Sequence, residues 1–123
     1  MKILYLSLLI LLSANATAAK ISQATNNEVE HLFKYLENSG CQFNRNNSWY
    51  TASEAVEHIK SKYEYLLEKG KITTTESFID MAATKSSMSG QQYEVKCESQ
   101  PSTPSSKWFT TELNNLRKLK TPN

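Results

Sequence analysis

The chain has 123 residues and a formal net charge of +2, with 14 lysines and arginines against 12 acidic residues. This length is typical of a single domain. A nearly neutral chain lacks the basic surface that nucleic-acid binding requires. Two histidines and two cysteines, without a local cysteine cluster, argue against a zinc site. We therefore expect no metal, no other cofactor and no nucleic-acid partner.

Residues 1–18 have the pattern of a secretory signal peptide. Lys2 supplies the positive charge, Ile3–Leu12 form the apolar segment, and Ala16–Ala18 provide an A-x-A cleavage site. The apolar run is shorter than the roughly 20 residues that a membrane-spanning helix needs. We therefore expect export, cleavage and a soluble monomer without a membrane anchor.

Cys41 and Cys97 are the two cysteines of the chain. In an exported protein they predict one disulfide, and two free buried thiols are the alternative. Alternation along the two predicted strands places both side chains on the inward face, which agrees with a bridge. The bridge would stabilise the fold by up to about 4 kcal/mol by closing a long loop. The absence of a C-x-x-C motif argues against a thioredoxin-type redox role.

Four segments carry the apolar spacing of amphipathic helices. Three of them begin at a threonine followed three residues later by glutamate, the pattern of a capping box. A threonine–proline pair begins the fourth, with proline as the first helical residue. The expected helices start at Thr25, Thr51, Thr73 and Thr103-Pro104, and the first three end near Asn38, Gly70 and Thr84.

A β-hairpin is predicted around Asn46-Asn47, because asparagine tolerates the positive φ angles of a tight turn. A two-residue loop places Phe43 opposite Tyr50 on the inward face. Trp49 would then face outward, and we expect it to pack under a neighbouring helix or loop rather than to form an interaction site.

A further strand is expected at residues 92–97, followed by a Ser/Pro-rich linker at residues 99–106. The sequence therefore predicts an α+β domain of about four helices packed on a small antiparallel sheet of two or three strands. This single domain would span residues 25–119. Residues 19–24 would form a flexible N-terminus, and residues 120–123 a disordered tail.

The polar loop Lys85–Gln91 is the densest group of small polar residues that could present a site. The chain lacks the S-x-x-K and G-x-S-x-G spacings, so no catalytic residue is assigned. Loop serines more often bond to the backbone. The candidate binding residues are Lys85, Ser86, Ser87, Ser89 and Gly90 of the loop, together with Arg45 and Tyr93.

Arg45 shares the inward face of the hairpin with Phe43 by strand alternation. We expect a structural arginine that is buried and paired with an acid. The alternatives are a side chain that extends to the edge, where its charge reaches water, and a clamp for an anion or a carboxylate. Glu54, His58 and Lys62 follow at steps of four on one helix face. This spacing is typical of an ordinary charged surface, although His58 could serve as a general base.

An ordered set of motifs runs through most of the chain. The motifs are Gly40-Cys41-x-Phe43-x-Arg45-Asn46, Tyr50, His58-Ile59-x-x-Lys62-Tyr63, Phe78-Ile79-Asp80, Ser86-Ser87-Met88-Ser89-Gly90-x-x-Tyr93-x-Val95-x-Cys97 and Trp108. This set resembles the YfeK-like family, a group of small exported bacterial proteins that carry a domain of unknown function. The resemblance covers about Val29 to Leu116 and implies a periplasmic protein of a Gram-negative bacterium, with no assigned activity.

A shorter resemblance concerns Ser89-Gly90-x-x-Tyr93, which is similar to the S-G-x-x-Y pattern of periplasmic C-type lysozyme inhibitors. In that family the serine and the tyrosine enter the enzyme's cleft. Those proteins are all-β barrels, whereas the present chain is predicted to be mostly helical.

The leading functional expectation is a non-enzymatic periplasmic binding or interaction module, with an envelope protein or a cell-wall component as partner. An inhibitor of a lysozyme-type cell-wall hydrolase, acting through residues 85–93, is the second hypothesis. An envelope-acting hydrolase that uses Lys85, Ser86 and Ser89 is the third.

Overall fold

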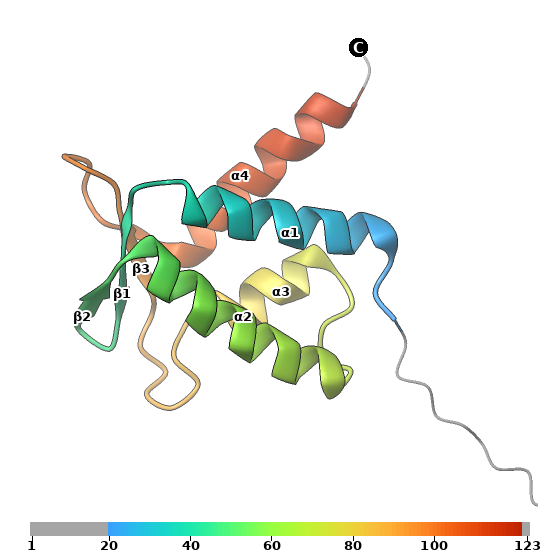
Figure 1. Ribbon diagram of the computed structural model, residues 1–123, viewed down its shortest axis with the longest axis horizontal. Helices are drawn as coiled ribbons and strands as arrows, with labels where there is room; N and C mark the ends of the chain where they lie inside the picture. Colours follow the sequence, from blue (N-terminus) through green and yellow to red (C-terminus); the bar gives the residue numbers. More distant parts are fainter. Residues whose placement is uncertain (1–19, 122–123) are drawn as a thin grey trace, which may run out of the picture.

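The structure is a computed structural model that describes residues 20–121 (Figure 1). The predicted signal peptide lies outside the described residues. The elements are α1 (Gln23–Glu37), β1 (Gln42–Arg45), β2 (Ser48–Tyr50), α2 (Ala52–Glu68), α3 (Thr75–Ala82), β3 (Glu94–Lys96), β4 (Thr103–Pro104) and α4 (Ser105–Lys120). The predicted α+β class is confirmed. None of the helices in this part of the chain has the length and apolar composition needed to cross a bilayer.

The four strands form one antiparallel sheet in the order β2-β1-β3-β4. Asn46 and Asn47 make the turn between β1 and β2 with φ angles of 52° and 66°, and Phe43 lies opposite Tyr50, as predicted. Trp49 is 42% exposed on β2. The expectation that Trp49 packs under a helix or loop is therefore wrong.

The fourth strand was not expected from the sequence. Thr103 pairs with Val95, and Pro104 pairs with Glu94. Two residues are too few to show alternation, and proline is tolerated because β4 is an edge strand. The sheet therefore has four strands instead of two or three. The predicted linker contains β4, and Pro104 is the N-cap of α4 rather than its first helical residue.

Two of the predicted helix starts are shifted. Ser22 caps α1 by accepting a hydrogen bond from the backbone N–H of Thr25. The helix therefore begins three residues earlier than a cap at Thr25 predicts, within the segment that was expected to be flexible. Thr74, rather than Thr73, caps α3. The predicted capping box at Thr51 is confirmed. At α3 the capping box is closed by Ser77 instead of Glu76. The two glutamates expected to close the boxes, Glu28 and Glu76, bind an arginine instead.

Arg117 on α4 binds carboxylates of both α1 and α3. Its Nε donates to Glu28 at 2.8 Å, its Nη2 donates to the other oxygen of Glu28 at 3.1 Å, and its Nη1 donates to Glu76. The Thr75 hydroxyl adds a hydrogen bond of 2.6 Å to Glu28. The Arg117 guanidinium is the largest cause that lowers the pKa of both carboxyl groups. We call these four residues the Arg117 network.

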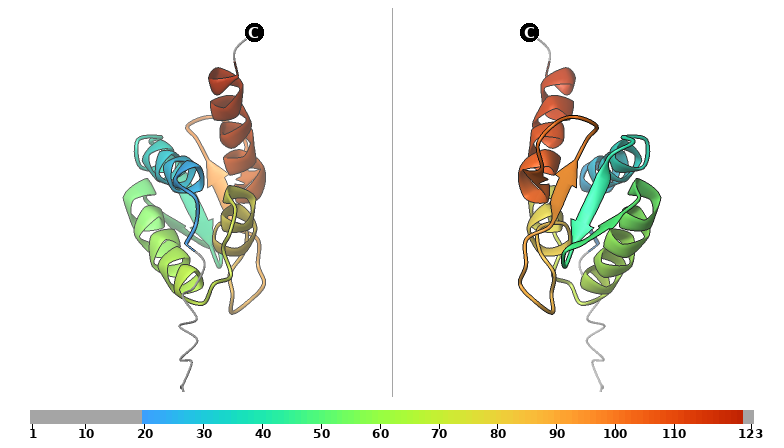
Figure 2. Two further views of the ribbon diagram at one scale, coloured as in Figure 1. Left: turned by 90° about the vertical axis from the view of Figure 1, so that its right-hand side faces the viewer. Right: turned by 90° about the vertical axis from the view of Figure 1, so that its left-hand side faces the viewer.

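The core lies between the helices and the inner face of the sheet. Phe78 of α3 is fully buried and makes ring contacts with Phe33, Tyr63 and Phe109, at centroid distances of 5.3, 5.1 and 6.4 Å. In the right-hand view of Figure 2, β1 and β3 run side by side between α2 and α4. The inward side chains of these strands, Phe43 and Val95 among them, complete the core.

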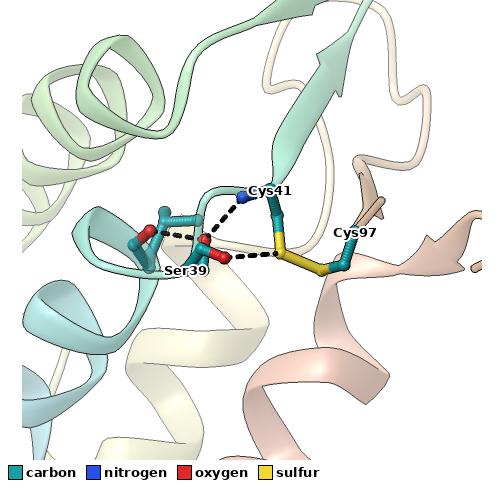
Figure 3. Close-up of a disulfide and its surroundings, with 4 residues drawn as sticks. Ser39, Cys41 and Cys97 are labelled. Carbon is teal, nitrogen blue, oxygen red and sulfur yellow. Dashed lines mark hydrogen bonds between the residues drawn. A yellow bond between two sulfur atoms is a disulfide. The ribbon is translucent and has the colours of Figure 1, made fainter. Parts of the chain in front are cut away.

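The predicted disulfide is confirmed between Cys41, just before β1, and Cys97, just after β3 (Figure 3). The loop after α1 is fixed beside it, because the Cys41 N–H donates to the Ser39 hydroxyl at 3.1 Å. The bridge and the sheet hydrogen bonds therefore hold the same two strands together. Strand β1 ends at Arg45, and Tyr93 directly precedes β3.

Candidate functional site

A cluster of polar side chains lies where α2 packs against β1. Arg45 leaves the end of β1, and its Nη1 donates to the His58 ring on α2, at 2.5 Å from Nδ1 and 3.1 Å from Nε2. Its Nη2 donates to the Tyr50 hydroxyl at 3.5 Å, and its Cζ lies 5.1 Å from the centroid of the Tyr50 ring. Arg45 is half-buried. It is therefore held by an imidazole, a hydroxyl and an aromatic face.

The expected acid partner of Arg45 is missing. Among residues 20–121, the ion pairs are those of Arg117 with Glu28 and Glu76, and that of His31 with Glu112. The expectation of an arginine paired with an acid is therefore wrong. The alternative interpretation, a clamp for an anion or a carboxylate, stays a prediction.

Tyr93 and Lys62 extend the cluster across the sheet. The Tyr93 hydroxyl lies 3.2 Å from Nε2 of His58. The Lys62 ammonium donates to the Lys85 carbonyl at 2.7 Å and lies 5.3 Å from the centroid of the Tyr93 ring. His58 and Lys62 were expected on an exposed or half-buried helix face with ordinary charge pairs. Both are half-buried, but they contact Arg45, Tyr93 and the Lys85 carbonyl instead of acids. We call Arg45, His58, Lys62 and Tyr93 the Arg45 cluster.

Burial and mutual repulsion set the charges of the cluster. Burial lowers the pKa of His58, and the positive charges of Arg45 and Lys62 lower it further. Burial also lowers the pKa of Lys62, with a smaller effect of Lys85. The pKa of the Tyr93 hydroxyl is raised by burial, an effect that Arg45 partly offsets. His58 is therefore neutral at pH 7, and the positive charge of the cluster resides on Arg45 and Lys62.

Two grooves meet at this cluster. The first, about 400 Å³, lies between the β1–β2 hairpin and α2. The second, about 330 Å³, lies between α2 and the loop after α3. Both are lined by Arg45, His58 and Ser61. The first groove adds Phe43, Tyr50, Glu54, Ala55 and Glu57, and the second adds Lys62, Tyr65, Ser86, Ser87, Met88 and Tyr93.

Residues 23–117 match a family described as Family of unknown function (DUF5329). The chain belongs to this family. Comparison with curated proteins and with solved structures gave no match. The matched range contains both grooves and the disulfide. Membership in this family assigns no activity, and the YfeK-like name and export stay predictions.

The polar loop of this family member is closed by its own hydrogen bonds. The Ser86 N–H donates to the Gln91 carbonyl and the Gly90 N–H donates to the Ser86 carbonyl, both at 2.9 Å. Ser86 is buried, and its hydroxyl accepts from the Ser89 N–H at 3.4 Å. Met88 at the tip is 98% exposed. The loop therefore has a defined shape and projects from the body of the protein (Figure 1).

Contacts with the hairpin turn hold this loop in place. The Ser89 hydroxyl donates to the Asn46 side-chain oxygen at 2.6 Å, and the Gln91 side-chain amide donates to that of Asn47 at 2.8 Å. Ser89 and Asn46 are 43 residues apart in sequence. The asparagines therefore form the β1–β2 turn and also bind the loop.

The seven predicted binding residues divide into two groups. Arg45, Ser86, Ser87 and Tyr93 line the second groove. Lys85, Ser89 and Gly90 line neither groove, and the Lys85 carbonyl rather than its amine takes part in a contact. Sequence reasoning missed the central position of His58 and Lys62. The sequence signal that could have shown it was their spacing of four residues from each other, next to buried Ile59.

Proposed function

We propose that this protein is a small, exported, non-enzymatic binding module of the periplasm, and that its ligand presents a carboxylate or phosphate group to Arg45. The half-buried guanidinium, which has no carboxylate partner among residues 20–121, carries this proposal. An envelope protein or a cell-wall component with an exposed anionic group is the expected partner.

Physical chemistry supports an anion at this position. Removing a guanidinium from water is unfavourable unless hydrogen bonds and an opposite charge compensate. Arg45 has neutral acceptors and a ring face, but no negative charge within ion-pair distance in the described part of the chain. Arginine donates in a planar fork that matches carboxylate and phosphate. The positive charge of Lys62, which like that of Arg45 lowers the pKa of His58, adds to the positive potential.

A non-enzymatic role agrees with the hydrogen bonds of the loop serines. Ser86 and Ser89 bond to the loop backbone, and Ser89 also bonds to Asn46. None of these partners is a base that could activate a nucleophile. The contacts therefore give no support to a hydrolase that uses Lys85, Ser86 and Ser89.

Anion titration monitored by amide NMR tests the proposal. Acetate and inorganic phosphate are added to the purified protein at constant ionic strength, with chloride as the reference anion. We expect saturable shifts at His58 and Tyr93. The Arg45→Gln variant should bind at least about tenfold more weakly, because a hydrogen bond to a charged group contributes roughly 1.5–3 kcal/mol.

Lys118→Gln is the matched control, because it removes one positive charge from α4 without touching either groove. Its affinity should equal that of the wild type. Shifts that never saturate, or equal weakening by both variants, would show a nonspecific charge effect and would overturn the proposal.

The proposed export is supported by the disulfide, because such bridges persist in oxidising compartments. Cell fractionation followed by mass spectrometry tests it. We expect a periplasmic species that begins near Lys20 and is oxidised at Cys41 and Cys97. An uncleaved, reduced chain in the cytoplasm would contradict export without affecting the anion site.

Inhibition of a cell-wall hydrolase is a second candidate, favoured by the projecting loop with exposed Met88. The similarity to lysozyme inhibitors needs an accessible tyrosine, but Tyr93 is only 1% exposed. An inhibitory contact would therefore use Ser87 and Met88 at the tip. If the purified protein in molar excess leaves lysozyme activity unchanged, this second function is excluded for that enzyme.

A further inference from the structure

The first groove is lined by charges of both signs, whereas the second is lined by positive charges without a carboxylate. Arg45 lies at its sheet side, and Glu54 and Glu57 of α2 line it as well. The second groove is lined by Arg45 and Lys62 without any carboxylate. A simple anion would be attracted to Arg45 but repelled by the two glutamates. The first groove therefore suits a different ligand from the second.

Glu54 is fixed in a defined position. Its Oε1 accepts from the Thr51 N–H at 3.2 Å and from the Thr51 hydroxyl at 2.9 Å, which completes the capping box of α2. The second carboxylate oxygen has no protein donor within hydrogen-bond distance in the described residues. Glu54 and His58 are four residues apart on α2, so Glu54 lies on the same helix face as the residue that contacts Arg45.

Neither glutamate forms an ion pair with Arg45 or with another cation among residues 20–121. The groove is thus lined by a cation and by carboxylates that do not pair with one another, and Phe43 and Ala55 add apolar surface to its lining. Its volume of about 400 Å³ is within the range of small-molecule sites.

We propose that the first groove binds a small zwitterion of the α-amino-acid type. The carboxylate of the ligand would accept hydrogen bonds from the free N–H groups of Arg45. The ammonium group of the ligand would lie against Glu54 and Glu57. This inference rests on the proposed anion site and specifies its ligand. A free amino acid carries both charges on one carbon, whereas a short peptide carries them at its two ends.

Titration calorimetry with four matched probes tests the inference on the full chain at constant ionic strength. Alanine carries both charges, N-acetylalanine only the carboxylate and alanine amide only the ammonium, and dialanine represents a peptide with both charges farther apart. We expect alanine to bind about three- to tenfold more tightly than N-acetylalanine, and alanine amide to bind weakest. Tighter binding of dialanine than of alanine would identify a peptide as the source.

The Glu54→Gln/Glu57→Gln double variant should remove the preference for alanine over N-acetylalanine. Glutamine can still close the capping box, so the helix start is retained. Glu64→Gln, an exposed carboxylate on α2 outside both grooves, is the matched control and should keep the preference. Circular dichroism and the thermal midpoint verify that each variant is folded.

The possible outcomes separate this inference from the proposed function. If N-acetylalanine binds the wild type as tightly as alanine, or if no amino-acid probe binds, the zwitterion inference is overturned. Arg45-dependent binding of acetate or phosphate would then still support the anion site. If those anions also fail to bind, both the inference and the proposed function are overturned.

Discussion

The protein contains two arginines, and their surroundings differ in one respect. Arg117 on α4 binds two carboxylates, Glu28 and Glu76. Arg45 on β1 binds an imidazole, a hydroxyl and a ring face. Arg117 is thus neutralised within the fold, whereas Arg45 retains an uncompensated positive charge beside two grooves. The same residue type joins helices in one region and is left available to a ligand in the other.

This difference separates a stabilising contact from a recognition site. A fold gains stability when a partly buried charge has a partner, and it loses stability when that charge is left unpaired. Replacing Arg117 should therefore mainly affect unfolding, and replacing Arg45 should mainly affect binding. The four predictions that follow test this division by their effects on unfolding, from the largest to the smallest.

Removal of the disulfide should have the largest effect. The bridge joins residues separated by 56 positions, and loop-closure entropy predicts a loss of about 4 kcal/mol in the Cys41→Ser/Cys97→Ser variant. Chemical denaturation measures this loss. Because the bridge joins β1 to β3, amide exchange should increase more in the sheet around Arg45 than around the Arg117 network. A uniform increase would show that the two regions are not independent.

The Arg117→Gln variant should be destabilised by about 1–2 kcal/mol. The Arg117 side chain is 43% exposed, so its pairs are partly screened by solvent. The Glu28 side chain is only 12% exposed and would lose its main charge partner. Urea denaturation measures the change, and Lys118→Gln is the control. Anion binding should be unaffected, and a loss of binding would contradict the division between the two regions.

Acidification should destabilise the two regions in separate pH ranges. Folding lowers the pKa of His58, so the unfolded chain binds the proton more readily and stability falls below about pH 6.5. Folding also lowers the pKa values of Glu28 and Glu76, so their contribution is present above about pH 4.5 and is lost below it. Urea denaturation at successive pH values measures both decreases.

Two variants assign these decreases. His58→Gln should remove the decrease in stability near neutral pH, because glutamine does not titrate. Arg117→Gln should reduce the decrease at lower pH, because its guanidinium is the largest cause of the lowered carboxyl pKa values. If either variant changed the other range instead, the assignment would be wrong.

The Arg45→Gln variant should have the smallest effect on unfolding, less than about 0.5 kcal/mol. Removing Arg45 leaves no carboxylate without its charge partner, because the ion pairs of the described residues do not include Arg45. The contacts that are lost go to a neutral imidazole, a hydroxyl and a ring face. Urea denaturation beside Arg117→Gln gives the comparison. A larger loss for Arg45→Gln than for Arg117→Gln would mean that Arg45 is structural.

Much of the fold followed from local sequence patterns. The hairpin register around Asn46-Asn47, the capping box at Thr51 and the pairing of Cys41 with Cys97 were all predicted and are confirmed. The starts of α1 and α3 were misplaced because Ser22 rather than Thr25 caps α1, and because Thr74 and Ser77 form the capping box of α3. Strand β4 was missed, since two residues carry no alternation.

The candidate site was predicted only in part. Alternation placed Arg45 on the inward face, but it could not show which groups lie opposite. The serines attracted attention by their composition, and the structure uses Ser86 and Ser89 to close the loop. His58 was interpreted as part of a surface face, because helical periodicity cannot say which neighbour covers the face.

The sequence by itself determined which four segments form helices, how the hairpin turns and which cysteines pair. Helices and turns depend on neighbouring residues, and two cysteines allow one pairing. Only the tertiary structure decided which arginine has an acid partner. Arg117 is 89 residues from Glu28, and Arg45 is 13 residues from His58. Such contacts depend on how α4 and α2 pack, and the charge left on Arg45 is a consequence of that packing.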